Sequence, residues 1–168
     1  MRQAVNDRRL TLTIHKIPDE NEPIFGDSER LLQLFKNLLS NAVKYTPDGG
    51  KITISNRILP GFIEICFQDT GIGINPDEQV TIFDKFSRLG NSALHSSGKV
   101  KFKGGGPGLG LHIAKGIIEA HNGTIWVESL GYDEKTCPGS IFHVLIPNRT
   151  SPPDDHSAKL YAHLQLKR

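Results

Sequence analysis

The stretch that decides the fold reads Gly104-Gly105-Gly106-Pro107-Gly108-Leu109-Gly110-Leu111, a glycine cluster that continues directly into a helix-like apolar segment, residues 112–120. Glycine permits positive φ values and the close approach of another group. The first turn of the helix that follows presents unpaired N–H groups at the positive end of its dipole. These features together predict an anion site, most often for phosphate, although a glycine run by itself is more often a flexible loop.

Length and composition limit the classes of protein to which the chain can belong. Its 168 residues predict one domain with a sizeable core, and its net charge of +2 does not favour a general nucleic-acid or membrane role. The two cysteines, Cys66 and Cys137, make no disulfide framework, and we interpret Cys66 as a small buried side chain. The sequence has no signal-peptide pattern and no apolar run near ~18 residues, so we expect a cytoplasmic domain.

The apolar periodicity predicts both strands and helices. Strands are expected at residues 10–15, 51–55, 62–68, 124–128 and 141–146. An amphipathic helix is expected after the N-cap Asp27 and should end near Tyr45, and a second helix should run from Leu109 to Asn122-Gly123. Asn75 is predicted to be the N-cap of a further helix. This pattern indicates an α/β two-layer sandwich, with a mixed sheet of about five strands and three helices on one face.

Three polar residues share one face of the first long helix. Asn37, Asn41 and Lys44 are spaced at i, i+4 and i+7, although asparagine inside a helix competes for backbone hydrogen bonds. A solvated helix face would explain them if the helix stood alone. The functional alternative is an oxygen ligand for Mg²⁺ beside a cation for phosphate, because one Asn carbonyl, nucleotide phosphates and water suffice for that ion.

The segment Asp69-Thr70-Gly71-Ile72-Gly73 follows the third predicted strand. One interpretation is a common turn at the end of a strand. The other is a carboxylate that accepts a hydrogen bond from an exocyclic amine, while Gly71 and Gly73 let the backbone pass close to a planar ring.

Four segments occur in a fixed order, at residues 37–45, 69–73, 83–86 and 106–111. In this order and spacing they resemble the N, G1, F and G2 boxes of the ATP-binding catalytic domain of sensor histidine kinases. The resemblance covers roughly residues 10–147 and implies the Bergerat (GHKL) fold, shared with type II topoisomerases, a heat-shock chaperone class and mismatch-repair ATPases. It divides the chain into residues 1–8, the end of a dimerisation-domain helix; 9–147, the ATP-binding domain; and 148–168, a polar tail or linker.

The resemblance implies ATP and Mg²⁺ as cofactors and gives individual residues their roles. Asn41 resembles the Mg²⁺ ligand, Lys44 a phosphate contact, and Asp69 the group that selects adenine through its amino group. Residues 91–103 resemble the ATP lid. The residues expected at the nucleotide are Asn37, Asn41, Lys44, Tyr45, Asp69, Gly71, Gly73, Ile74, Phe86, Arg88, Lys103, Gly106, Gly108, Leu109, Gly110 and Leu111.

Two positions decide how far the resemblance extends to activity. Asn37 stands where related hydrolytic ATPases carry a water-activating Glu, and an amide cannot act as a base. This favours a protein that passes the phosphoryl group to a histidine, a reaction that depends on positioning and charge stabilisation. Pro107 stands where the family usually has a residue with a backbone N–H, so its phosphate contact must be lost or taken by a neighbour.

The phosphoacceptor histidine of the family is missing from this sequence. None of the seven histidines precedes an acidic residue, and we interpret each as structural or solvated. We therefore expect a monomeric domain that binds ATP and does not autophosphorylate alone. Its expected partners are a dimerisation and phosphoacceptor domain of the same protein and a response regulator, with no nucleic acid, in a longer protein that can be membrane-anchored. The alternatives are a nucleotide-sensing module, a hydrolytic ATPase and an anti-sigma-factor type serine kinase of the same fold.

Overall fold

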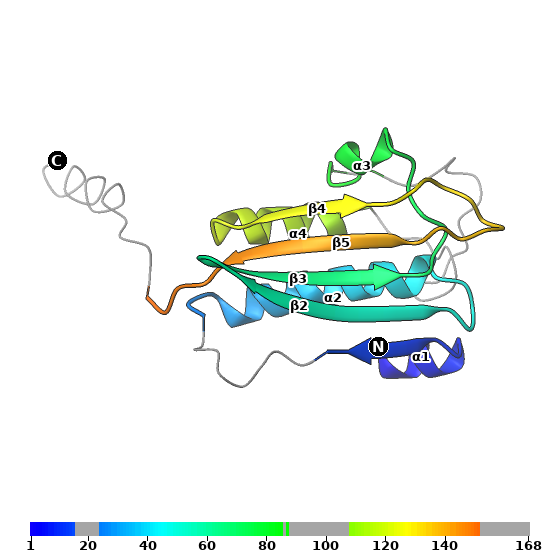
Figure 1. Ribbon diagram of the computed structural model, residues 1–168, viewed down its shortest axis with the longest axis horizontal. Helices are drawn as coiled ribbons and strands as arrows, with labels where there is room; N and C mark the ends of the chain where they lie inside the picture. Colours follow the sequence, from blue (N-terminus) through cyan, green and yellow to red (C-terminus); the bar gives the residue numbers. More distant parts are fainter. Residues whose placement is uncertain (16–23, 86, 88–107, 152–168) are drawn as a thin grey trace, which may run out of the picture.

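The computed structural model describes residues 1–15, 24–85, 87 and 108–151. In this part of the chain, a five-stranded sheet forms one layer and the long helices cover one of its faces (Figure 1). This arrangement confirms the predicted α/β sandwich. In chain order the elements are α1 (Arg2–Asp7), β1 (Thr11–Ile14), α2 (Ser28–Tyr45), β2 (Lys51–Leu59), β3 (Phe62–Asp69), α3 (Glu78–Thr81), α4 (Gly110–Ala120), β4 (Thr124–Glu128) and β5 (Ser140–Pro147).

The sheet is mixed, with strand order β1-β2-β3-β5-β4. β1 runs parallel to β2, and the other neighbouring strands are antiparallel. The predicted hairpin turn at Pro60-Gly61 is present, with Gly61 at φ 77°. β2 extends beyond the predicted residue 55 to Leu59, because it pairs with β3 from Ile52↔Asp69 to Leu59↔Phe62.

The core lies between the sheet and the two long helices. α2 contributes Leu34 and Leu38, and α4 contributes Ala114 and Ile118, all fully buried. The sheet supplies Phe67, Phe142, Val144 and Ile146 to the same cluster. Asp27 caps α2 as predicted, since Asp27 Oδ1 accepts hydrogen bonds from the N–H groups of Glu29 and Arg30. None of the helices in the described ranges has the length and apolar character that a membrane span needs.

The predicted helix N-cap at Asn75 is wrong. The third helix, α3, is a single turn beside β4, and its N-cap is Asp77 (Figure 1). Asn75 Oδ1 does not cap this turn; it accepts a hydrogen bond from the Tyr132 N–H at 3.3 Å, and Asn75 Nδ2 donates to Glu78 Oε2. A tertiary contact therefore uses the oxygen that a local cap would need.

The N-terminal segment is fastened to the C-terminal end of α2. Ala4, Val5 and Leu10 form a second apolar cluster with Ala42, Val43 and Ile52. Arg8, only 8% exposed, donates from its guanidinium group to the carbonyls of Val43 and Thr46 and pairs with Asp48 at 2.8 Å. These contacts hold the helix end that carries the predicted nucleotide residues. That residues 1–8 end a dimerisation-domain helix stays a prediction.

Replacing Arg8 with methionine tests this fastening. Arg8→Met leaves two buried carbonyls without their donor, so we expect the free energy of unfolding to fall by about 2–3 kcal/mol. The measurement is the midpoint of urea-induced unfolding. Arg2→Met, at an exposed position of α1, is the control and should stay within about 0.5 kcal/mol of wild type. Equal midpoints for the two variants would contradict the role given to Arg8.

Candidate functional site

A hydrogen bond joins the predicted N-box and G2-box segments. Asn37 Nδ2, in the middle of α2, donates to the carbonyl of Gly110 at the start of α4, at 3.1 Å. A Cβ added at Gly110 would lie 3.9 Å from Asn37, which is an ordinary contact. Packing therefore does not require glycine at position 110, and the Asn37 amide adds a polar contact to the apolar packing of α2 against α4.

The other two polar residues predicted at the nucleotide on α2 follow along the same face. Asn41 is half-buried one turn after Asn37, and Lys44 lies one turn further on. Lys44 Nζ sits 4.6 Å from the centroid of the Tyr45 ring, which holds the ammonium group near the end of the helix. The Tyr45 carbonyl accepts a hydrogen bond from the Ile72 N–H at 3.2 Å, so the helix end is joined to the predicted G1 segment.

Asp69 is a buried carboxyl group at the end of β3, with 5% of its surface exposed. Its Oδ1 accepts a hydrogen bond from the Gly71 N–H at 2.8 Å. Burial raises the pKa of Asp69 to about 7, although hydrogen bonds from the backbones of Gly71 and Ser140 act in the opposite direction. The carboxyl group is therefore fixed in orientation and close to its titration point at neutral pH.

The glycines of the G1 segment make room for the protein's own backbone. A Cβ at Gly71 would lie 2.6 Å from both Asp69 Oδ1 and the Tyr45 carbonyl oxygen. Gly73 has φ +73°, and a Cβ there would lie 1.9 Å from the Gly131 carbonyl oxygen. The sequence predicted that these glycines admit a planar ring. In the structure, they let the loop after β3 pass between the end of α2 and the loop before β5.

Contacts from that loop were not anticipated from the sequence. Ser129 Oγ accepts a hydrogen bond from the Ile74 N–H at 3.0 Å, and the Gly139 N–H donates to the Gly71 carbonyl at 2.9 Å. The side chain of Ile74 itself lies in the core. Ser and Gly near a strand end are typical of any turn, so no local signal marks these residues as support for the G1 segment.

The start of α4 has the features predicted for an anion site. Gly108 has φ +69°, and Leu109 is the N-cap, without a side chain that could accept hydrogen bonds from the first turn. Leu111 is 9% exposed and packs in the core, which leaves its backbone N–H as the part that can face a ligand. His112 Nδ1 lies 3.2 Å from the Phe83 carbonyl oxygen and joins the predicted F-box segment to α4.

Several predicted nucleotide contacts lie outside the described residues. They are Phe86, Arg88, Lys103, Gly106 and the lid at 91–103, together with Pro107. Their roles stay predictions.

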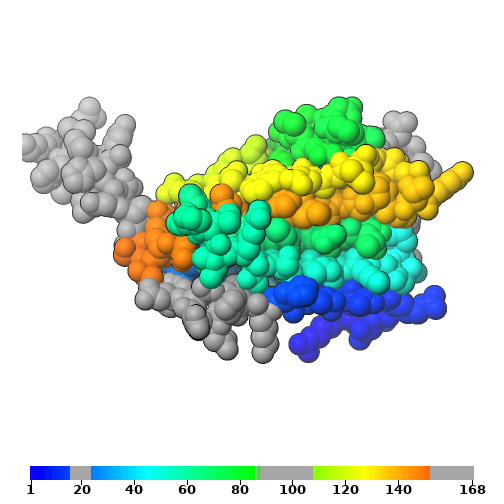
Figure 2. Space-filling view, viewed as in Figure 1, coloured from blue at the N-terminus to red at the C-terminus, as the bar shows by residue number. Residues whose placement is uncertain are grey.

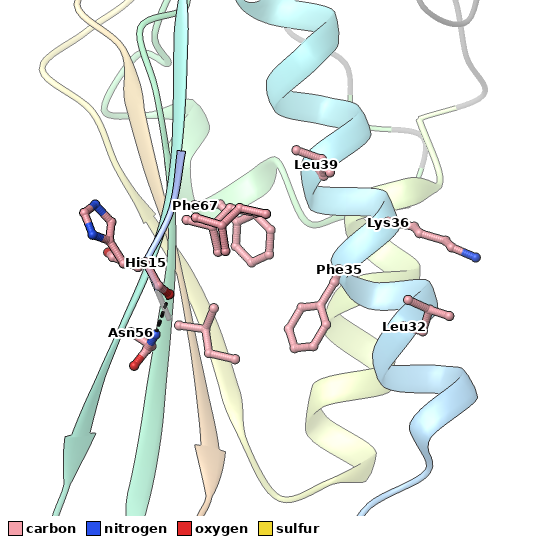
Figure 3. Close-up of a pocket in the computed structure, with 11 residues that line it drawn as sticks. His15, Leu32, Phe35, Lys36, Leu39, Asn56 and Phe67 are labelled. Carbon is pink, nitrogen blue, oxygen red and sulfur yellow. Dashed lines mark hydrogen bonds between the residues drawn. The ribbon is translucent and has the colours of Figure 1, made fainter. Parts of the chain in front are cut away.

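A separate apolar cavity of about 380 Å³ lies on the other flank of α2, toward β1 (Figure 3). Phe35 and Leu39 line it from the helix and Phe67 from the sheet, whereas the Lys36 ammonium group points away from the sheet. The cavity contains none of the residues predicted at the nucleotide. At its edge, Asn56 Nδ2 donates to the carbonyl of His15, which is directly followed by residues outside the described ranges.

The pH dependence of folding tests the buried Asp69. Its pKa is about 7 in the folded state against 3.8 ordinarily, so the folded state keeps a proton that the unfolded state releases. This stabilisation is complete below about pH 4 and is lost as the pH rises through about 7. We expect wild type to be less stable toward urea at about pH 8 than at about pH 5, and Asp69→Asn to reduce that difference. Asp77→Asn, at an exposed position, is the control; a difference unchanged in Asp69→Asn would contradict this assignment.

Residues 26–150 match the family described as "Histidine kinase-, DNA gyrase B-, and HSP90-like ATPase". The signal transduction histidine-protein kinase BaeS of Escherichia coli (strain K12) is 40% identical over 124 residues, which are 74% of this chain and 25% of that protein. The solved mycobacterial sensor histidine kinase MprB shares the fold with a TM-score of 0.67 and 28% identity, covering 88% of this chain and 89% of that one. Full-length ShkA in complex with AMPPNP has a TM-score of 0.66 at 24% identity, covering 90% of this chain and 28% of that one.

The chain spans about a third or less of the length of the curated relatives it matches. The family match includes α2, the G1 segment and the start of α4, which are the elements that meet at the site. The chain therefore belongs to the histidine kinase-, DNA gyrase B- and HSP90-like ATPase family, and its domain is of the catalytic type found in sensor histidine kinases.

Proposed function

We propose that this domain binds ATP with Mg²⁺ and presents the γ-phosphoryl group to a histidine on a separate dimerisation and phosphoacceptor domain of the same protein. The observation that carries the proposal is the convergence of three segments. The second half of α2, the end of β3 and the start of α4 lie toward the same end of the sandwich (Figure 1). The Asn37–Gly110 and Ile72–Tyr45 hydrogen bonds connect them.

Asp69 and the start of α4 would hold opposite ends of the nucleotide. The buried Asp69 carboxyl group, fixed by the Gly71 N–H, is suited to accept a hydrogen bond from the adenine amino group. The first-turn N–H groups of α4 and the Lys44 ammonium group are suited to the phosphates. Full-length ShkA, which has the same fold, was solved with AMPPNP, an adenine nucleotide analogue, and this supports ATP as the ligand.

Asn41 is the residue proposed to hold Mg²⁺ through its side-chain oxygen. Its half-buried position on the α2 face between Asn37 and Lys44 suits an ion that takes one protein oxygen and fills its shell with phosphate oxygens and water. When bound, the ion neutralises charge on the phosphates during transfer.

The contact made by Asn37 favours phosphoryl transfer over hydrolysis. Its amide N–H₂ donates to the Gly110 carbonyl, and an ionised glutamate, which only accepts hydrogen bonds, could not make this contact. The position thus adds a hydrogen bond between α2 and α4 and offers no base to activate water. The domain then needs only to position ATP, because the attacking histidine comes from the partner domain. A response regulator would receive the phosphoryl group next, and we propose a cytoplasmic location for these reactions.

Phosphoryl transfer in trans tests the activity. We expect the domain, mixed with a separately prepared dimerisation domain of its own protein and γ-labelled ATP, to place an acid-labile phosphoryl group on a histidine of that partner. The domain incubated alone should stay unlabelled and should leave the ATP intact. A failure to label the partner despite normal ATP binding would favour the nucleotide-sensing alternative. Fast release of phosphate by the domain alone would favour the hydrolytic ATPase.

The proposed metal ligand is tested by Asn41→Leu. In the presence of Mg²⁺, we expect ATP affinity to fall about tenfold, equivalent to ~1.4 kcal/mol, because the ion loses its protein oxygen. With EDTA present, the variant and wild type should bind alike. Gln33→Leu, two turns earlier on α2, is the control and should keep the wild-type response to Mg²⁺. A full Mg²⁺ effect in Asn41→Leu, measured by titration with a fluorescent ATP analogue, would remove Asn41 from the site.

A further inference from the structure

The sheet face turned away from α2 and α4 carries a cluster of metal-ligating side chains. Side chains alternate along a strand, so Ile63 and Phe67 of β3 face the core while Glu64 and Cys66 face the other side. On β5, His143 points to that same side and is the register partner of Cys66. Figure 2 shows this face, where atoms of β2 to β5 form the surface and the long helices lie behind.

The three ligand atoms are close enough together to share one ion. His143 Nδ1 lies 2.9 Å from Glu64 Oε1 and 3.5 Å from Cys66 Sγ, and all three atoms are within 4.8 Å of one another. A tetrahedral ion with the usual zinc bond lengths, ~2.3 Å to sulfur and ~2.0–2.2 Å to nitrogen and oxygen, separates its ligand atoms by about 3.3–3.6 Å. Small side-chain movements would therefore suffice to bind it.

The surroundings of the three residues hold them in place. Glu64 is only 1% exposed, and Arg57 on the neighbouring strand pairs with its other carboxylate oxygen, Oε2. The His143 ring stacks on Trp126, with ring centroids 4.7 Å apart and planes 3° from parallel. The cluster is thus partly shielded from solvent on a rigid sheet, as a preorganised metal site requires.

The second ring nitrogen of His143 lies beside a further carboxylate. Nε2 is buried and has no hydrogen-bond partner within the described ranges, and Glu128 Oε1 lies 3.7 Å away. The ring thus lies between two carboxylates, Glu64 at Nδ1 and Glu128 at Nε2. If Nδ1 binds a metal, Nε2 carries the proton and faces Glu128, which is the usual outer carboxylate of a metal-bound histidine.

The same residues do not fit a cysteine nucleophile. A catalytic triad places the nucleophile and the carboxylate on different nitrogens of the histidine ring. Here both Cys66 and Glu64 approach Nδ1.

We propose that Glu64, Cys66 and His143 form a binding site for a zinc-type divalent ion, with a fourth position open to water, on the sheet face opposite the helices. The mixed sulfur, nitrogen and oxygen ligands suit zinc and its neighbours in the transition series, whereas Mg²⁺ requires hard oxygen ligands. On binding, the Cys66 Sγ–H bond breaks, the proton leaves to solvent and the thiolate ligates the ion. This site is separate from the proposed nucleotide site and does not depend on it.

Cobalt(II), which takes zinc sites and absorbs visible light, is the probe. Added to the reduced, tag-free chain, Co²⁺ should give a thiolate charge-transfer band and tetrahedral d–d bands, which Zn²⁺ then removes by competition. Cys66→Ser should lose the charge-transfer band, while Cys137→Ser, which changes the other free cysteine, should keep it. Absence of the bands in wild type, or their persistence in Cys66→Ser, would overturn the proposal.

A second measurement uses the unaltered chain and so does not depend on the folding of a variant. Zn²⁺ should slow alkylation of Cys66 by iodoacetamide at least tenfold, as read for each cysteine by mass spectrometry, and should leave Cys137 unaffected. Equal alkylation rates of Cys66 with and without Zn²⁺ would also overturn the proposal. ATP affinity should be the same in Cys66→Ser as in wild type, because Cys66 lies outside the proposed nucleotide site. Loss of ATP binding therefore bears only on the nucleotide proposal, and loss of the cobalt bands bears only on the zinc proposal.

Discussion

At the end of β3, neighbouring backbone segments pass so close to one another that only glycine fits. The proposed nucleotide site depends on this packing. Gly71 lies against the Tyr45 carbonyl, Gly73 against the Gly131 carbonyl, and a Cβ at Gly139 would lie 2.3 Å from the Asp69 carbonyl oxygen. The Ile72 N–H donates to the Tyr45 carbonyl and the Gly139 N–H donates to the Gly71 carbonyl, so hydrogen bonds join this segment to its neighbours on both sides. The Asp69 carboxyl group is therefore buried and oriented by main-chain atoms, which keep their positions better than flexible side chains do.

The two faces of the sheet have different chemistry because strand side chains alternate. On one face, β3 and β5 bring Phe67, Phe142 and Val144 to the helices and form the core. On the other, the same two strands bring Glu64, Cys66 and His143 together. Nucleotide recognition is proposed at the end of β3 and metal binding at its middle, so a single strand would connect both sites.

α2 shows how one helix can support the core and the site at once. Leu34 and Leu38 of its apolar stripe are fully buried, while Asn37 and Lys44 lie on a different stripe, from which Asn37 contacts α4. Arg8 binds the carbonyls at the C-terminal end of this helix from a segment that precedes β1. The eighteen residues of α2 thus take part in core packing, in the contacts with the N-terminal segment, and in the proposed phosphate and Mg²⁺ contacts.

Features that depend on neighbours in the sequence were predictable without the fold. The Asp27 cap, the amphipathic α2, the Pro60-Gly61 turn and the alternation of β3 depend on residues within a few positions of each other, and the structure confirms them. The four boxes likewise identified the family, because their order and spacing are properties of the chain alone. These local preferences persist because the tertiary contacts of these segments agree with them.

Contacts between distant residues needed the folded chain. Asn75 fails as a helix cap because Tyr132, 57 residues later, takes its side-chain oxygen, and Gly73 lies so close to the Gly131 carbonyl that a Cβ would not fit. The pKa of Asp69 and the meeting of Cys66 with His143, 77 residues apart, depend on burial and strand register. Periodicity assigns a side chain to a face of its own strand or helix, but only the pairing of strands and the packing of layers decide which side chain from elsewhere it meets.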